Sequence, residues 1–88
     1  MKATAFDGWA MYRAMLEQHL AEAEQHVIKG ERYVADQRER VAKLENGGHN
    51  TTDAITYARK SLDLFEDILL SYVAERDRLR KQLAEVRW

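Results

Sequence analysis

Apolar residues recur every seven positions along two long stretches of the chain. The first stretch has two neighbouring rows, one of Leu20, Val27, Val34 and Val41 and one of Leu16, Ala23, Gly30, Gln37 and Leu44. The second stretch has a row of Ile55, Leu62, Leu69, Arg76 and Leu83 and a row of Ala58, Phe65, Tyr72, Leu79 and Val86. Paired rows at this spacing are typical of helices that pack along a shared seam. The pattern therefore predicts two long helices, one at about residues 5–45 and one at about residues 51–86.

A short polar segment at about residues 46–50 separates the two helices. We expect the turn to be formed by Gly47, Gly48, His49, Asn50 and Thr51. The glycines can adopt the left-handed conformation that ends a helix, and the second helix is capped either by Asn50, with Asp53 three residues later, or by Thr51. Because a short link makes consecutive helices antiparallel neighbours, the sequence predicts an all-α fold, an antiparallel two-helix hairpin that forms a single domain over residues 1–88.

Aligning the rows across the turn predicts which residues face one another. The predicted neighbours are Leu44 and Ala54, Gln37 and Ser61, Gly30 and Ile68, and Leu16 and Leu83. The same register places the acidic residues Glu17, Glu22 and Glu24 beside the basic residues Arg76, Arg78, Arg80 and Lys81. Exposed pairs of this kind contribute only about 0–1 kcal/mol each, but they disfavour other registers.

Three residues depart from the apolar rows, and we expect them to set the specificity of the seam. Gly30 allows the two helices to approach closely. Gln37, opposite Ser61, is a polar residue of the kind that fixes register or oligomeric state, with contact to a ligand as the alternative. Arg76 is expected to extend past the seam to an acidic neighbour.

The apolar surface is wider than one partner helix can cover. Its additional residues, beside the two seams, are Tyr12, Met15, Tyr33, Tyr57, Leu64, Ile68 and Val73. A contiguous apolar patch of this kind usually marks an interface. We therefore expect a homodimer in which two hairpins complete an antiparallel four-helix bundle.

The composition of the chain limits its other sources of stability and its partners. At 88 residues a single core only marginally offsets the entropy of folding, and the absence of cysteine excludes disulfides and thiolate metal sites. The formal net charge of −1 gives no field that would attract nucleic acid or anionic lipid. The N-terminus lacks the layout of a secretory signal and no apolar run has membrane-spanning length, so we expect a cytoplasmic protein without a membrane partner.

Two histidines, His19 and His26, end two copies of Glu-Gln-His that lie one heptad apart. That spacing is too long for one metal ion held within a helix, and no glutamate stands three residues before either histidine, as the di-iron bundles require. We expect half-buried histidines at the edge of a bundle, with a metal site built with Glu22 at a dimer interface as the alternative. His49 is expected to be an exposed turn residue, with a binding role as its alternative.

The end of the second helix is rich in charge and suggests a further alternative. Its basic residues are Arg76, Arg78, Arg80, Lys81 and Arg87, and the acidic residues among them are Glu75, Asp77 and Glu85. A basic helix end can bind phosphates, so a nucleic-acid-associated regulator is possible, although the interspersed acids favour a solvated, salt-bridged face. Trp9 and Trp88 are expected near this end, either packed together or presenting an aromatic contact.

The middle of the chain carries a set of spaced residues, namely His26, Val27, Gly30, Val34, Gln37, Val41, Leu44, Gly48, His49, Thr51 and Ala54. Together with the later Phe65-Glu66 and Arg76-Asp77-Arg78-Leu79, this pattern resembles that of a group of short uncharacterised proteins of rhizobia and related alphaproteobacteria, whose usual aspartate is replaced here by Asn50. The resemblance implies a bacterial cytoplasmic protein and no particular activity. It also picks out Gly30, Gln37 and the turn.

The motifs that usually carry chemistry are missing from the sequence. It has no nucleophile elbow, phosphate loop, zinc pattern or paired carboxylates, and a two-helix chain has little concavity of its own. The sequence therefore predicts neither an enzyme nor a bound cofactor. Our leading hypothesis is a non-enzymatic protein that self-associates and acts through protein–protein contacts, as a small regulator or adaptor.

Overall fold

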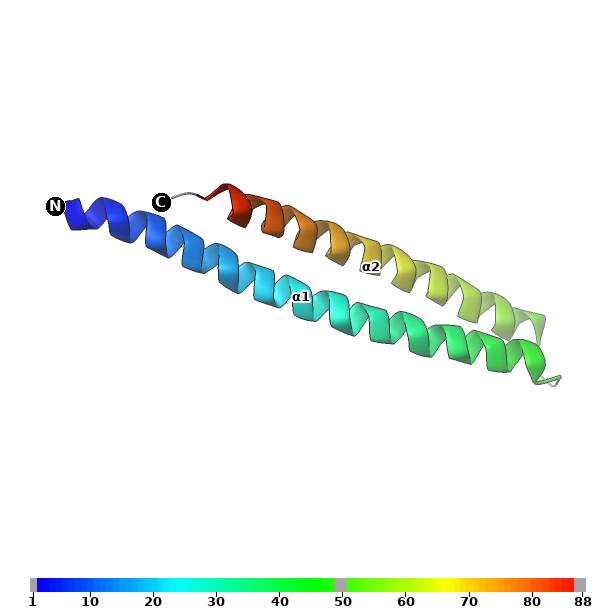
Figure 1. Cartoon of the computed structure of the whole chain (residues 1–88). Helices are drawn as coiled ribbons and strands as arrows, with labels where there is room; N and C mark the ends of the chain where they lie inside the picture. Colours follow the sequence, from blue (N-terminus) through cyan, green and yellow to red (C-terminus); the bar gives the residue numbers. More distant parts are fainter. Residues whose placement is uncertain (1, 49–50, 87–88) are drawn as a thin grey trace.

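The structure, a computed structural model, describes residues 2–48 and 51–86, with side chains from residue 8 onward. It contains two α-helices, α1 over Lys2–Asn46 and α2 over Thr52–Glu85. They run antiparallel and side by side (Figure 1), and the predicted helical hairpin is confirmed. Helix α1 begins before the predicted start near residue 5, because neither proline nor glycine stands among the first seven residues to interrupt it.

Helix α2 is capped by Thr51, one of the two residues that the sequence offered. Thr51 has an extended backbone with φ −75° and ψ 156°, and its Oγ1 accepts a hydrogen bond from the backbone N–H of Ala54 at 3.1 Å. Its carbonyl oxygen accepts the first backbone bond of the helix, from the N–H of Ile55 at 3.2 Å. The other candidate, Asn50, and the neighbouring turn residue His49 lie outside the described residues.

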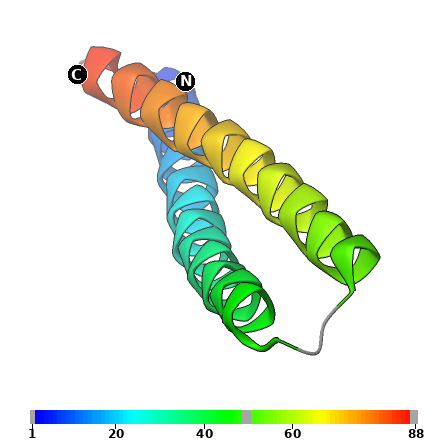
Figure 2. The same ribbon diagram turned by 90° about the vertical axis from the view of Figure 1, so that its right-hand side faces the viewer.

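Helix α1 ends at the paired glycines. The N–H of Gly47 donates to the carbonyl oxygen of Leu44 at 3.4 Å, which closes the last turn. Gly48 follows with φ +67°, in the left-handed region that a side chain disfavours. The reversal seen in Figure 2 therefore depends on a backbone conformation that glycine adopts without strain.

The core is a single seam between the helices. Its buried apolar residues all belong to the predicted rows: Leu16, Ala23, Val27, Val34, Val41, Ala58 and Leu79. Most of these side chains are small, and the larger row residues of α2, such as Leu62 and Phe65, are only half-buried. At the open end of the hairpin, Leu20, Leu83 and Val86 pack around the buried cluster. The seam is thus one side chain thick, and both outer sides of the helix pair lie open over the described residues (Figure 2).

Gly30 is the described glycine of α1 that packs against α2. A β-carbon on Gly30 would lie 3.1 Å from Cδ1 of Leu69 and 3.4 Å from Cδ2 of Tyr72. The side chains against Gly30 are therefore those of Leu69 and Tyr72. Ile68, the neighbour that the alignment predicts, sits beside the seam and is 38% exposed.

Gln37 is the one buried polar residue among those described, and it donates across the seam. Its Nε2 lies 3.0 Å from the carbonyl oxygen of Ala58, one helical turn before the predicted neighbour Ser61. The long side chain reaches the backbone of α2, which always offers a carbonyl lone pair, so the expected side-chain partner is replaced by a main-chain one. This hydrogen bond satisfies a buried donor and ties the register of the two helices.

The left-handed glycine leads to a test of the turn. Gly48→Ala is expected to destabilise the hairpin by about 1 kcal/mol, because a β-carbon disfavours that conformation. Gly8→Ala is the matched control: Gly8 has open space around the position of a β-carbon, so alanine there should leave stability unchanged or raise it by up to about 1 kcal/mol. Urea unfolding followed by circular dichroism at one protein concentration measures both. Equal losses in the two variants would contradict the role of Gly48.

Candidate functional site

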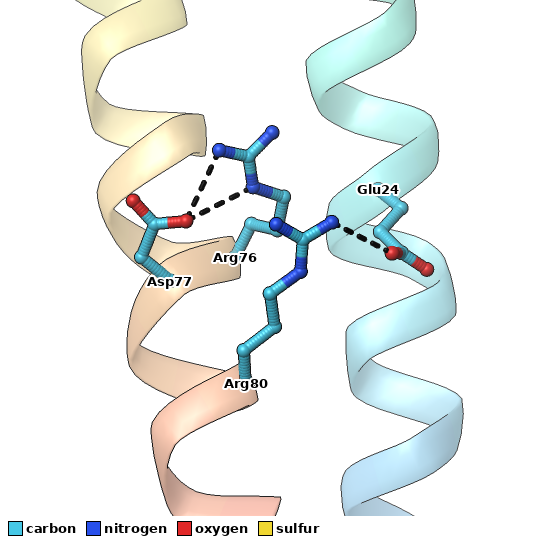
Figure 3. Close-up of polar contacts among 4 residues, drawn as sticks. All are labelled: Glu24, Arg76, Asp77 and Arg80. Carbon is cyan, nitrogen blue, oxygen red and sulfur yellow. Dashed lines mark hydrogen bonds and ion pairs between the residues drawn. The ribbon is translucent and has the colours of Figure 1, made fainter.

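The two sides of the seam differ in chemistry. One side, called the ionic flank here, carries three ion pairs between the described residues of the two helices, formed by Glu24, Arg38, Glu45, Arg59, Glu66 and Arg80. Arg38 lies 2.9 Å from Glu66, and Arg80 lies 3.2 Å from Glu24 (Figure 3). The members on each helix are spaced by seven residues or fourteen, so they form one ladder along the rod. Opposite charges therefore close this side of the hairpin.

The other side is aromatic and apolar, and we call it the aromatic flank. It comprises Tyr12, Met15, His19, His26 and Tyr33 of α1 with Tyr57, Leu64, Phe65, Ile68 and Tyr72 of α2. Two ring contacts cross the seam here: His26 stacks on Tyr72 with centroids 5.0 Å apart, and Tyr33 lies against Phe65 at 6.2 Å. The flank thus joins the helices by rings where the other side uses ion pairs.

Most of the predicted interface residues lie on the aromatic flank and are exposed to solvent. Tyr33 is 63%, Leu64 58% and Tyr57 76% exposed, and Tyr12, Met15 and Ile68 are exposed to a smaller extent. Val73 differs from these six, because it is half-buried and its place in the heptad puts it on the ionic flank, in the gap between Glu66 and Arg80. The prediction treated both sides of α2 alike, and only the packing of the helices separates them.

Some exposed apolar residues were not singled out by the sequence. Met11, Ile28 and Leu70 are among them, at 71%, 46% and 66% exposure. Ile28 and Leu70 lie on faces that point away from the aromatic flank, and scattered exposed residues of this kind are normal on proteins. Met11 belongs to the part of α1 that extends past the end of α2. The sequence could have identified Met11 by the greater length of the first apolar stretch, which extends beyond the second when the two are aligned across the turn.

That extension shapes the open end of the hairpin. Helix α1 has 45 residues and α2 has 34, so the N-terminal turns of α1 extend past the end of α2 (Figure 1). Trp9 and Tyr12 meet there edge to face, with ring centroids 6.5 Å apart. They border an open hollow of about 700 Å³ together with Gly8, Gln82, Glu85 and Val86. Trp88, the predicted companion of Trp9, lies outside the described residues.

A second hollow, of about 220 Å³, opens on the aromatic flank itself. Its walls are His26, Lys29, Tyr33, Phe65, Ile68 and Tyr72, and its floor is Gly30. The missing side chain of Gly30 lets the rings of the two helices come together and leaves a shallow apolar depression between them. Gly30 therefore shapes the surface as well as the seam.

The basic end of α2 is largely paired with carboxylates. Arg76, which extends from the seam, lies 3.0 Å from its neighbour Asp77, while Arg80 reaches Glu24 on α1 (Figure 3). Arg78 bonds Glu75 on its own helix. A phosphate group would have to compete with these carboxylates, so the geometry adds no support to nucleic-acid binding.

The Glu75 carboxyl at this end has a lowered pKa. The hydrogen bond from Arg78 is the main cause, which desolvation opposes and the charges of Arg78 and His19 reinforce. Both His19 and His26 are exposed, where the sequence predicted half-buried side chains, because the aromatic flank of a single hairpin has no cover.

The described residues of one chain do not form a metal site. Within the part of the chain that the structure describes, no three His, Asp or Glu side chains lie close enough together to share a metal ion. The two histidines sit two helical turns apart on α1, and His26 uses its ring to stack on Tyr72. A site made by two chains together stays an alternative hypothesis.

Comparison of the chain with protein-family models, with curated proteins and with solved structures found no match. Neither helix, over its described residues, is long and apolar enough to cross a membrane. The aromatic flank is the most distinctive part of the described surface.

The buried amide of Gln37 supplies a test of the seam. Gln37→Glu is expected to cost about 2–3 kcal/mol of stability at pH 7, because it removes the donor and buries a charge beside the carbonyl of Ala58. Burial raises the pKa of a carboxyl above its unfolded value, so the loss should shrink as the pH falls towards 4, where the protonated group can donate. Urea unfolding at pH 4 and pH 7 measures this.

The control for that test is Gln37→Leu, which removes the donor without adding charge. Its stability should stay within about 1 kcal/mol of the parent at both pH values, since the carbonyl of Ala58 keeps its helical hydrogen bond. If Gln37→Glu were as stable as Gln37→Leu at pH 7, position 37 would be solvated and the buried hydrogen bond would be wrong.

Proposed function

We propose that the protein is a non-enzymatic module that self-associates through its aromatic flank, two hairpins forming a four-helix bundle that acts through protein–protein contacts. The observation that carries the proposal is the asymmetry of the hairpin. The ionic flank is closed by a ladder of ion pairs that are well solvated by water. The aromatic flank exposes the apolar side chains of Tyr33, Leu64 and Ile68. Covering that face removes apolar area from water and is the strongest available driving force for association.

The size of the flank supports a second copy as its occupant. The Cα atoms of the hairpin extend over 72 × 15 × 13 Å, so one long face measures roughly 1,000 Å². A stable interface buries about 800 Å² on each partner. A face of this size is thus large enough for a stable dimer.

The thin core supports the same conclusion. The buried side chains are mainly alanine and valine, and among the described residues none of the large ones is fully buried. A chain of this size that buries one narrow seam is only marginally stable. Association would bury the half-exposed rings Phe65 and Tyr72 and add to the stability of each hairpin.

We infer further that the module works in the bacterial cytoplasm as a small regulator or adaptor. The support for this setting is the resemblance of the central residues, including Gly30 and Gln37, to the rhizobial proteins. The part of α1 that extends past α2 presents Met11 on its outer face, which offers a contact for a different protein once the aromatic flank is covered.

The proposal is tested by two lysine substitutions on opposite sides of α2. Ile68→Lys places a charge on the aromatic flank and is expected to weaken the dimer by at least about tenfold, because the charge would have to be desolvated. Val73→Lys is the matched control: it makes a similar change on the same helix, but on the ionic flank opposite the acidic Glu31, and should change the association by less than about threefold. Light scattering on a sizing column across a dilution series measures the mass of each variant.

Two further results decide the test. The unfolding temperature of the parent should rise with protein concentration, because only the associated form is stabilised by mass action. A parent that stays monomeric at high micromolar concentration would contradict self-association, and equal weakening by both substitutions would contradict the choice of flank. Circular dichroism confirms that each variant remains helical.

A further inference from the structure

The aromatic flank is apolar at both ends, but the two ends draw mainly on different helices. Near the turn the exposed apolar residues are Tyr57, Leu64 and Ile68 of α2 with Tyr33 of α1, and at the open end they are Tyr12 and Met15 of α1, beside Trp9. The exposed side chains between these two groups are mainly charged or polar. The flank therefore consists of two unlike apolar patches on either side of a polar centre.

The polar centre on α1 changes sign along the helix. Glu22 and Lys29 lie seven residues apart, so they project from the same face of α1, and both are exposed. His26 lies between them, stacked on Tyr72. The negative charge thus stands on the side of the open end and the positive charge on the side of the turn.

We propose that a second copy docks on the aromatic flank end for end, with the two-fold axis beside His26, so that Glu22 of each copy meets Lys29 of the other. This inference rests on the proposed self-association and adds its orientation. A two-fold axis that reverses the rod exchanges the two sides of its centre. A negative group on one side and a positive group on the other, equally far from the axis, are then brought together twice in each dimer.

The same axis matches the apolar patches. The stacking of His26 on Tyr72 and of Tyr33 on Phe65 fixes the level of each α2 residue along α1. At a rise of ~1.5 Å per residue, Tyr12 lies roughly 20 Å from the axis on one side, while Leu64 and Tyr57 lie roughly 13 and 23 Å from it on the other. Reversal therefore places the open end of each copy at the level of the exposed patch near the other copy's turn, with Tyr12 over α1 and beside Leu64 and Tyr57 of α2.

The opposite orientation, with both turns at the same end, matches the surface less well. It sets α1 of one copy over α2 of the other at equal height. It would also leave the Trp9 and Tyr12 patches of both copies at one end, beyond the ends of both α2 helices.

A charge exchange tests the contact at the axis. Glu22→Lys and Lys29→Glu each place like charges against one another twice per dimer, and each is expected to weaken association about five- to tenfold. The double variant restores opposite charges and should return the dissociation constant to within about twofold of the parent. Glu39→Lys, the same change of charge on the outer face of α1, is the control and should behave like the parent. Sedimentation at low ionic strength measures all four.

Distances between spin labels test the orientation directly. The chain has no cysteine, so Ala21→Cys and Ala42→Cys, both exposed on the outer face of α1, each give one label per copy. End-for-end docking predicts offsets along the rod of roughly 14 Å for position 21 and 50 Å for position 42. Docking with both turns together predicts nearly the same separation at the two positions.

The outcomes separate this inference from the proposed function. Restoration by the double variant with unequal label distances supports end-for-end docking. Equal distances, or a double variant as weak as the single ones, overturn the orientation while self-association stands. A protein that shows no label pairs and a monomeric mass at every concentration overturns the proposed function as well.

Discussion

The close packing of α1 against α2 along one narrow seam is the contact on which the rest of the structure depends. Small buried side chains and the bare backbone of Gly30 let the helices approach until Leu69 and Tyr72 touch α1. Gln37 then holds the register by donating to the backbone of α2. Since a two-helix hairpin can bury only one stripe on each helix, every other side chain is sorted to one flank or the other by the rotation that this seam imposes.

That sorting produces two surfaces with opposite solvation. The ion pairs of the ionic flank lie in water, where each contributes little energy but requires no cover. The rings of the aromatic flank contribute packing across the seam and still leave a large part of their area exposed. The difference gives the hairpin a direction for association, because only one side gains by losing water. The function that we propose is therefore a property of a surface.

The repeated Glu-Gln-His illustrates how a motif can arise from packing. His19 and His26 belong to a row that continues to Tyr12 and Tyr33, all on the edge of the aromatic flank. Their spacing follows the heptad and their rings serve the same face, with His26 stacked on Tyr72. The glutamates of the two copies, Glu17 and Glu24, fall on the ionic side, where Glu24 pairs with Arg80. One repeat thus contributes to both flanks because neighbouring heptad positions lie on opposite sides of the seam.

The sequence by itself determined the helices, the seam rows and the turn, because heptad spacing and the paired glycines are local properties of one segment. The buried residues fall in the predicted rows, and Gly48 has the predicted left-handed backbone. Only the tertiary structure decided that Thr51 caps α2, that Gln37 bonds Ala58, and that Val73 and Ile68 lie on opposite flanks. Periodicity places a residue beside the seam but does not say on which side, since that depends on how two helices are rotated and shifted against each other.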